Sequence, residues 1–94
     1  MKYFYVYILK CGDGSLYVGH TDDLERRLGE HKSGQCFGYT SMRLPVELVF
    51  VRSFATRDDA FKYERTIKNW SKKKKEALIN CDWNALSEAA KKKF

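Results

Sequence analysis

The sequence contains no apolar run that approaches the roughly 18 residues needed for a membrane-spanning helix. Its opening stretch, MKYFYVYILKCGDG, places the apolar block too early for a secretory signal and has no small-residue cleavage site. These absences argue against both a membrane span and a signal peptide. We therefore expect a cytoplasmic protein with no membrane partner.

Cysteine and histidine are also scarce, with three cysteines and two histidines in 94 residues. Cys11, Cys36 and Cys81 are odd in number and far apart, whereas a disulfide framework needs an even set and a zinc site needs paired spacings. His20 and His31 do not complete a zinc pattern. We therefore expect reduced thiols, with neither a disulfide scaffold nor a structural zinc centre.

Positive charge is in excess, because 18 Lys and Arg against 12 Asp and Glu give a net charge of +6. A basic surface attracts phosphate polymers and releases their counterions, so nucleic acid is the first partner to consider. A lysine surplus that only improves solubility has the same composition. Charge alone leaves these two explanations open.

The chain is long enough for one domain, and its aromatic residues would supply much of the core energy. Periodicity and turn residues predict strands over residues 3–9, 16–20 and 46–54, and helices over residues 22–32, 56–70 and 72–80. This order, β-β-α-β-α-α, predicts an α+β fold with a small three-stranded antiparallel sheet flanked by helices. We expect one domain over residues 1–80, with residues 81–94 as its C-terminal helical extension.

The loop between the first two strands decides whether two tyrosines can meet. A two-residue turn at 13–14 would put Tyr7 and Tyr17 on opposite faces of the sheet, whereas a three-residue loop at 12–14 brings them to one face. The longer loop needs a left-handed residue at its end, which Gly14 can supply. Because it also gathers the aliphatic residues of both strands on the other face, we predict the longer loop.

Three positions admit a structural and a functional explanation. Gly19, beside Tyr17, marks either a close approach to the strand or the point where the chain leaves it. Arg27 has Asp23 four positions earlier as a surface partner. Glu64 lies in the apolar stripe of its helix, where a carboxylate is costly unless it is paired or binds a metal, and Lys68 is the local candidate partner. Burial favours a functional role for Glu64.

A run of four lysines, residues 72–75, begins the last well-defined helix, which Ser71 can cap. Cations at a helix start oppose the helix dipole. The run is either a solvated face or a set of phosphate contacts.

In combination these residues resemble the GIY-YIG nuclease superfamily, and most closely its small stand-alone bacterial members. The first family signature aligns with residues 5–7 and the second with residues 17–19. The helix arginine of the family, ten positions after the second-signature tyrosine, aligns with Arg27, and its helical acidic residue aligns with Glu64. Each signature is short, but all four occur in order and at the family spacing over residues 3–80.

The resemblance implies phosphodiester hydrolysis assisted by one divalent metal ion, Mg or Mn. Glu64 would hold the metal, and water would fill most of the remaining positions. Tyr17 would be the general base toward the attacking water, with Tyr7 positioning or sharing that proton. Arg27 would stabilise charge on the phosphoryl oxygens, and His31 would orient a phenol or contact phosphate.

Two positions depart from the family pattern, because Tyr5 replaces the first glycine and His20 stands where lysine or threonine is common. The expected nucleic-acid contacts are Tyr5, Gly19, His20, Lys72, Lys73 and Lys74. We predict metal-dependent, structure-selective cleavage of DNA, with RNA as the alternative substrate, in DNA repair or recombination, and a protein partner that supplies specificity. The alternatives are a non-catalytic nucleic-acid-binding module that keeps the fold, and a protein-interaction domain.

Overall fold

The computed structural model describes residues 2–34 and 40–80. The expected C-terminal helix, together with Cys36 and Cys81, lies outside these residues. Cys11 lies within them and is a buried free thiol. In the described part of the chain, no helix is long and apolar enough to cross a membrane.

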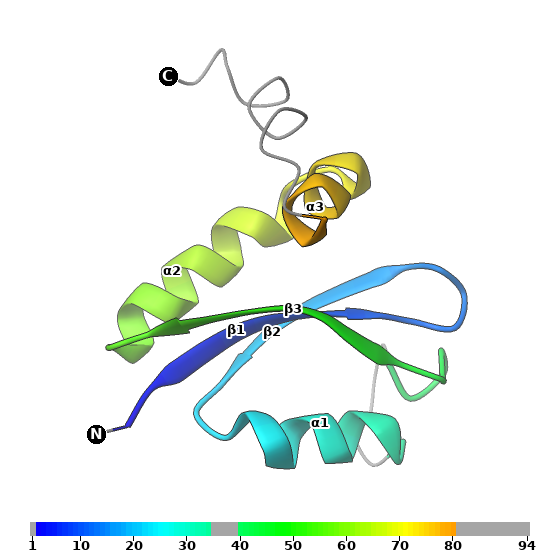
Figure 1. Ribbon diagram of the computed structural model, residues 1–94, viewed down its shortest axis with the longest axis horizontal. Helices are drawn as coiled ribbons and strands as arrows, with labels where there is room; N and C mark the ends of the chain where they lie inside the picture. The colour runs from blue at the N-terminus through cyan, green and yellow to red at the C-terminus, as the bar shows by residue number, and fades with distance from the viewer. Residues whose placement is uncertain (1, 35–39, 81–94) are drawn as a thin grey trace.

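The structure confirms the α+β fold and the predicted order of elements. These are β1 (Phe4–Lys10), β2 (Leu16–Thr21), α1 (Leu24–Lys32), β3 (Glu47–Phe54), α2 (Arg57–Lys68) and α3 (Lys72–Ile79). The strands form one antiparallel sheet in the order β2-β1-β3, so β2 lies at an edge. Helix α1 covers one face of the sheet, and α2 and α3 cover the other (Figure 1).

Each helix begins at a side-chain cap. The side-chain oxygens of Asp23, Thr56 and Ser71 accept hydrogen bonds from backbone N–H groups three residues later. The α3 cap, Ser71, is the one that the sequence predicts, and the α2 cap, Thr56, is the first residue of the predicted second helix. Capping by Asp23 makes Leu24 the first residue of α1, whereas the predicted helix begins at residue 22.

The hairpin between β1 and β2 has the predicted three-residue loop. Tyr7 pairs with Gly19, and Leu9 pairs with Tyr17, so both tyrosines lie on the same face. Gly14 adopts a φ of 85°, the left-handed conformation that the loop requires.

Two apolar clusters lie on opposite faces of the sheet. The cluster toward α2 and α3 has a buried centre of Val6, Ile8, Val18, Ala60, Ile67 and Leu78. The cluster toward α1 contains Tyr7, Leu9, Cys11 and Val46, with Leu24 and Leu28 packed on it. Aliphatic residues therefore fill one face, whereas the α1 face includes a buried phenol.

Candidate active site

The Tyr7 side chain lies between the sheet and α1, with 1% of the residue exposed. Its hydroxyl is 3.0 Å from Nε2 of His31 on α1. A Cβ atom added at Gly19 would lie 2.6 Å from the same hydroxyl oxygen. Gly19 is therefore the position where β2 lets the Tyr7 phenol approach its backbone, and the chain does not leave the strand there, because β2 continues to Thr21. The Tyr17 ring lies alongside, with its centroid 6.4 Å from that of Tyr7.

The His31 imidazole connects this phenol to the loop before β3. Its Nδ1 is 2.7 Å from the hydroxyl oxygen of Thr40, a buried residue. Burial lowers the pKa of His31 below its ordinary 6.5, and the nearby Arg27 cation lowers it further. The ring is therefore neutral at pH 7, so that it donates through one nitrogen and accepts through the other. Thr40, His31 and Tyr7 form a buried hydrogen-bonded chain.

Arg27 lies on the outer part of α1, with its guanidinium Nη1 3.3 Å from Oε1 of Glu30. The same carboxylate lies 3.5 Å from Nε of Arg26. Asp23, the surface partner considered for Arg27, uses its side chain to cap the helix. Arg27 is therefore a half-exposed cation one helical turn before His31.

Glu64 is buried on α2, with 6% of the residue exposed. Its Oε2 lies 3.0 Å from Nδ1 of His20 on β2, and its Oε1 lies 3.7 Å from Nζ of Lys68. Lys68, the partner that the sequence suggests, therefore makes the longer of the two contacts. The shorter contact joins Glu64 on α2 to His20 on β2. His20 and Glu64 meet on the face of the sheet that α2 covers.

Glu64 supplies one carboxylate, a ligand type that suits a hard divalent cation such as magnesium. The described residues contain no group of three or more His, Cys, Asp and Glu side chains placed to hold a metal ion. A carboxylate that supplies one or two oxygens, with water as the other ligands, is a common way for proteins to bind Mg²⁺. Glu64 is the residue that would hold such an ion.

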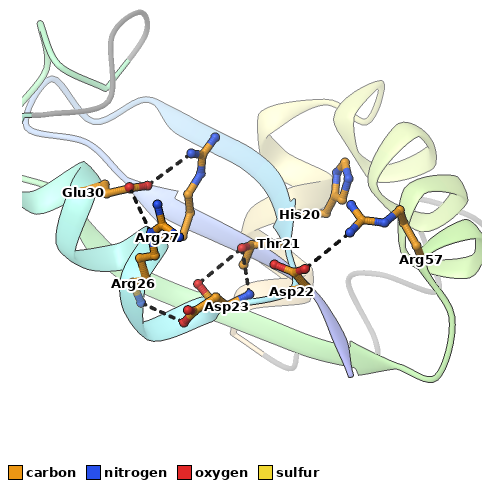
Figure 2. A pocket seen from close by; sticks show the side chains of 8 residues that line it. All are labelled: His20, Thr21, Asp22, Asp23, Arg26, Arg27, Glu30 and Arg57. Carbon is orange, nitrogen blue, oxygen red and sulfur yellow. Dashed lines mark hydrogen bonds and ion pairs between the residues drawn. The ribbon is translucent and has the colours of Figure 1, made fainter. Parts of the chain in front are cut away.

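A pocket of about 310 Å³ lies at the end of β2 (Figure 2). Its lining residues are His20, Thr21, Asp22, Asp23, Arg26, Arg27, Glu30 and Arg57. Figure 2 shows His20 and Arg57 on one side of this pocket and Arg27 and Glu30 on the other. His20 in this lining contacts Glu64 on the α2 face of the sheet. Arg27 in the same lining lies one helical turn before His31 on the α1 face.

The family model of the GIY-YIG catalytic domain matches residues 3–77. The chain belongs to the GIY-YIG family. It is 49% identical over 75 residues to a UPF0213 protein of Bacillus pumilus, covering 80% of this chain and 76% of that protein. It is 46% identical over 80 residues to a UPF0213 protein of Staphylococcus saprophyticus, covering 85% of this chain and 98% of that protein.

Two solved structures resemble this GIY-YIG chain. The solution structure of the UPF0213 protein BH0048 from Bacillus halodurans is 42% identical, with a TM-score of 0.56 over 84% of each chain. The solution structure of EF2693 from E. faecalis is 40% identical, with a TM-score of 0.60 over 86% of each chain. These similarities are consistent with the sheet and helices described above.

The GIY-YIG residues expected from the sequence thus form two groups. Tyr7, Tyr17 and His31 lie together on the α1 face, with Gly19 beneath the Tyr7 hydroxyl. Glu64 lies on the α2 face with His20. The two groups approach the β2 edge from opposite faces, and the pocket at the end of β2 includes His20 but neither phenol nor Glu64 in its lining.

The remaining expected nucleic-acid contacts differ in accessibility. Lys72 and Lys73 are exposed at the start of α3. Lys74 is buried, with its Nζ 4.1 Å from the centre of the Trp70 ring, a cation–π contact that occupies this side chain within the fold. Tyr5 is half-buried and lines a separate shallow pocket together with Leu24 and Leu28 of α1.

Three residues near the site are not among those expected from the sequence. Arg57 lines the pocket, and its Nη2 lies 3.4 Å from Oδ2 of Asp22. The Phe61 ring packs against His20, and the Thr40 hydroxyl forms a hydrogen bond with Nδ1 of His31. Arg57 and Phe61 precede Glu64 by seven and three residues, a spacing that places all three on one side of the helix. The sequence could therefore have indicated these two residues. Nothing in the sequence around Thr40 indicates its partner.

Proposed function

We propose that this GIY-YIG chain is a metal-dependent nuclease that hydrolyses phosphodiester bonds in DNA. The observation that carries the proposal is the hydrogen bond between the buried Tyr7 hydroxyl and the neutral His31 ring. A buried phenol and imidazole cost desolvation free energy, and apolar side chains of similar volume would fill the space without that cost. Proton transfer gives a reason for keeping both polar groups.

In the proposed reaction Tyr17 is the general base toward the attacking water, and Tyr7 positions or shares the proton. A phenol has an ordinary pKa of about 10, so either tyrosine needs help to act near neutral pH. The Tyr7 hydroxyl has His31 at hydrogen-bond distance, and a neutral ring can accept this hydrogen bond at Nε2. His31 would therefore orient the Tyr7 phenol, and the nearby positive charge of Arg27 and of the metal ion would favour the phenolate form of the tyrosine that acts as the base.

Positive groups on both sides of the β2 edge would stabilise the negative charge of the phosphate. Arg27, on the α1 side of the pocket, would bind the phosphoryl oxygens as charge develops on them. On the other side, Glu64 would hold the divalent metal ion, whose charge stabilises the phosphoryl oxygens and the leaving group when bound. His20, bonded to the Glu64 carboxylate, positions that carboxylate toward the end of β2.

The test is cleavage of branched, nicked and single-stranded DNA in magnesium or manganese. Glu64→Gln and Tyr17→Phe are each expected to slow cleavage by about 100-fold or more, since each removes a group that acts on the transition state. Glu76→Gln, an exposed glutamate on α3, is the matched control and should cleave normally. Unchanged cleavage by Glu64→Gln would refute the assigned metal site.

A non-catalytic nucleic-acid-binding module is the second candidate. It is favoured by the position of the phenols and Glu64 on opposite faces of the sheet, together with the net charge of +6. Metal-independent DNA binding that survives both substitutions, with no cleavage by the unsubstituted protein, would establish this alternative. In the nuclease proposal the protein acts in the cytoplasm in DNA repair or recombination, and a protein partner supplies further specificity.

A further inference from the structure

Phe61 is an exposed aromatic residue beside the proposed metal-binding glutamate. It lies on α2 with 43% of the residue exposed. Its ring makes an edge contact with His20, with 5.7 Å between ring centroids, and His20 in turn bonds Glu64. Single exposed apolar residues are common on protein surfaces, so exposure alone carries no meaning. The charged residues around this ring, however, point to a ligand.

Two arginines flank Phe61 along the same side of α2. Arg57 lies four residues before it and Arg65 four residues after it, a spacing that aligns side chains on one face of a helix. The guanidinium carbon of Arg65 is 5.7 Å from the centre of the Phe61 ring. Arg57 lines the pocket at the end of β2. The row of cation, aromatic ring and cation matches single-stranded nucleic acid, in which phosphates bind arginine and bases stack on aromatic rings.

The distance along the helix limits which base could reach the ring. Residues three apart on a helix have Cβ atoms about 5–6 Å from each other, which is the case for Phe61 and Glu64. Successive bases in one strand are about 3.4 Å apart when stacked. A base on Phe61 would therefore belong to a nucleotide one or two positions from the phosphate that would bind the metal ion at Glu64.

A base inside a duplex is paired and stacked on both faces, and extracting it costs a few kcal/mol. An unpaired base offers its face without that cost. We propose that Phe61 is a stacking site for an unpaired nucleobase next to the bond that is cut, which makes the preferred substrate DNA with an unpaired nucleotide at that position, as in single strands, flaps and gaps. The inference rests on the proposed nuclease function for its meaning, but the stacking contact itself can be measured without cleavage.

The experiment measures binding in metal-free buffer, where no cleavage is expected, by fluorescence anisotropy of a labelled single strand and of the matching duplex. Phe61→Ala is expected to weaken binding of the single strand by about 5- to 150-fold, the range found for one base–aromatic stack, and to leave duplex binding unchanged. Phe61→Trp should retain the preference. Val51→Ala, at a residue on β3 that is also 43% exposed, is the control and should bind both DNAs normally.

A second readout reports stacking directly. A single strand with one 2-aminopurine should lose fluorescence on binding the unsubstituted protein at one position of the probe, because stacking quenches this base. Phe61→Ala should abolish that loss, and Glu64→Gln should preserve it. Equal weakening of single-strand and duplex binding, or quenching that survives Phe61→Ala, would overturn the stacking site. If stacking is found and no metal supports cleavage, the nuclease proposal fails instead.

Discussion

The two faces of the sheet are filled in different ways. On the α2 and α3 side, the buried centre consists of aliphatic side chains, and its buried acidic group, Glu64, lies beside His20 on the β2 edge strand. On the α1 side, a phenol and an imidazole are buried among leucines and bond to each other. The aliphatic centre of the first face therefore stabilises the fold and leaves polar groups only at its β2 edge, whereas the second face holds a hydrogen-bonded phenol and imidazole within its apolar cluster.

The largest expected effect comes from the aliphatic face. Ile8→Ala removes a fully buried side chain and is expected to lower the free energy of unfolding by about 2–5 kcal/mol, measured by urea denaturation. Cleavage by the fraction that remains folded should be unchanged, because Ile8 points away from the phenols. Tyr7→Phe on the opposite face is the matched variant. Tyr7→Phe should lower the free energy of unfolding by about 1–3 kcal/mol, because His31 loses the hydroxyl that it bonds, and it should strongly reduce cleavage.

One result would contradict this difference between the two faces. If Ile8→Ala slowed cleavage by the folded protein as much as Tyr7→Phe, the two faces would not be functionally distinct. Cleavage is therefore measured at a temperature where urea curves show both variants to be folded.

The next effect concerns how closely β2 approaches the phenol. Gly19→Ala would place a methyl group 2.6 Å from the Tyr7 hydroxyl oxygen, so the ring must move. We expect a loss of about 1–3 kcal/mol in unfolding free energy, typical of overpacking, together with weaker cleavage. Thermal denaturation and the cleavage assay measure the two consequences.

Gly29→Ala supplies the control for Gly19→Ala, since an added Cβ at Gly29 in α1 meets nothing within 4 Å. Alanine should therefore stabilise this helix by about 0.5–1 kcal/mol. If both glycine variants behaved alike, the effect at Gly19 would be a general property of glycine rather than of its contact with Tyr7.

Local sequence signals predicted the parts of the molecule that depend on neighbouring residues. The hairpin register follows from the alternation of aliphatic and aromatic residues around Gly14, and the caps at Thr56 and Ser71 follow from single side chains. Lys74 shows the same principle in a contact that was not predicted. Its partner, Trp70, is four residues earlier, a spacing that brings side chains together on a helix.

Contacts between distant elements were not predictable in this way. The sequence indicated Lys68 as the partner of Glu64, but the closer partner is His20, 44 residues away, because the docking of α2 on β2 is set by the whole core. Likewise, Thr40 lies in a connection without hydrophobic periodicity, so its bond to His31 had no local signal. The family resemblance supplied the candidate residues, and the structure supplied the faces on which they lie.

The smallest expected effect is a pH dependence of stability that comes from His31 on the α1 face. Its pKa is lower in the folded protein than the 6.5 of the unfolded chain, because burial and the Arg27 cation disfavour the charged ring. The unfolded state therefore binds more protons below pH 6.5, so stability is fully present above this pH and falls as the pH decreases toward the folded-state pKa, by less than about 1.4 kcal/mol per pH unit. Urea denaturation from pH 7.5 to pH 5 at roughly constant ionic strength measures this slope.

His31→Gln should flatten the pH dependence of the unfolding free energy, whereas His20→Gln on the other face should leave the His31 contribution in place. A slope that persists undiminished in His31→Gln would show that the protons are taken up elsewhere, and that the imidazole on the α1 face is not the group held neutral by the fold.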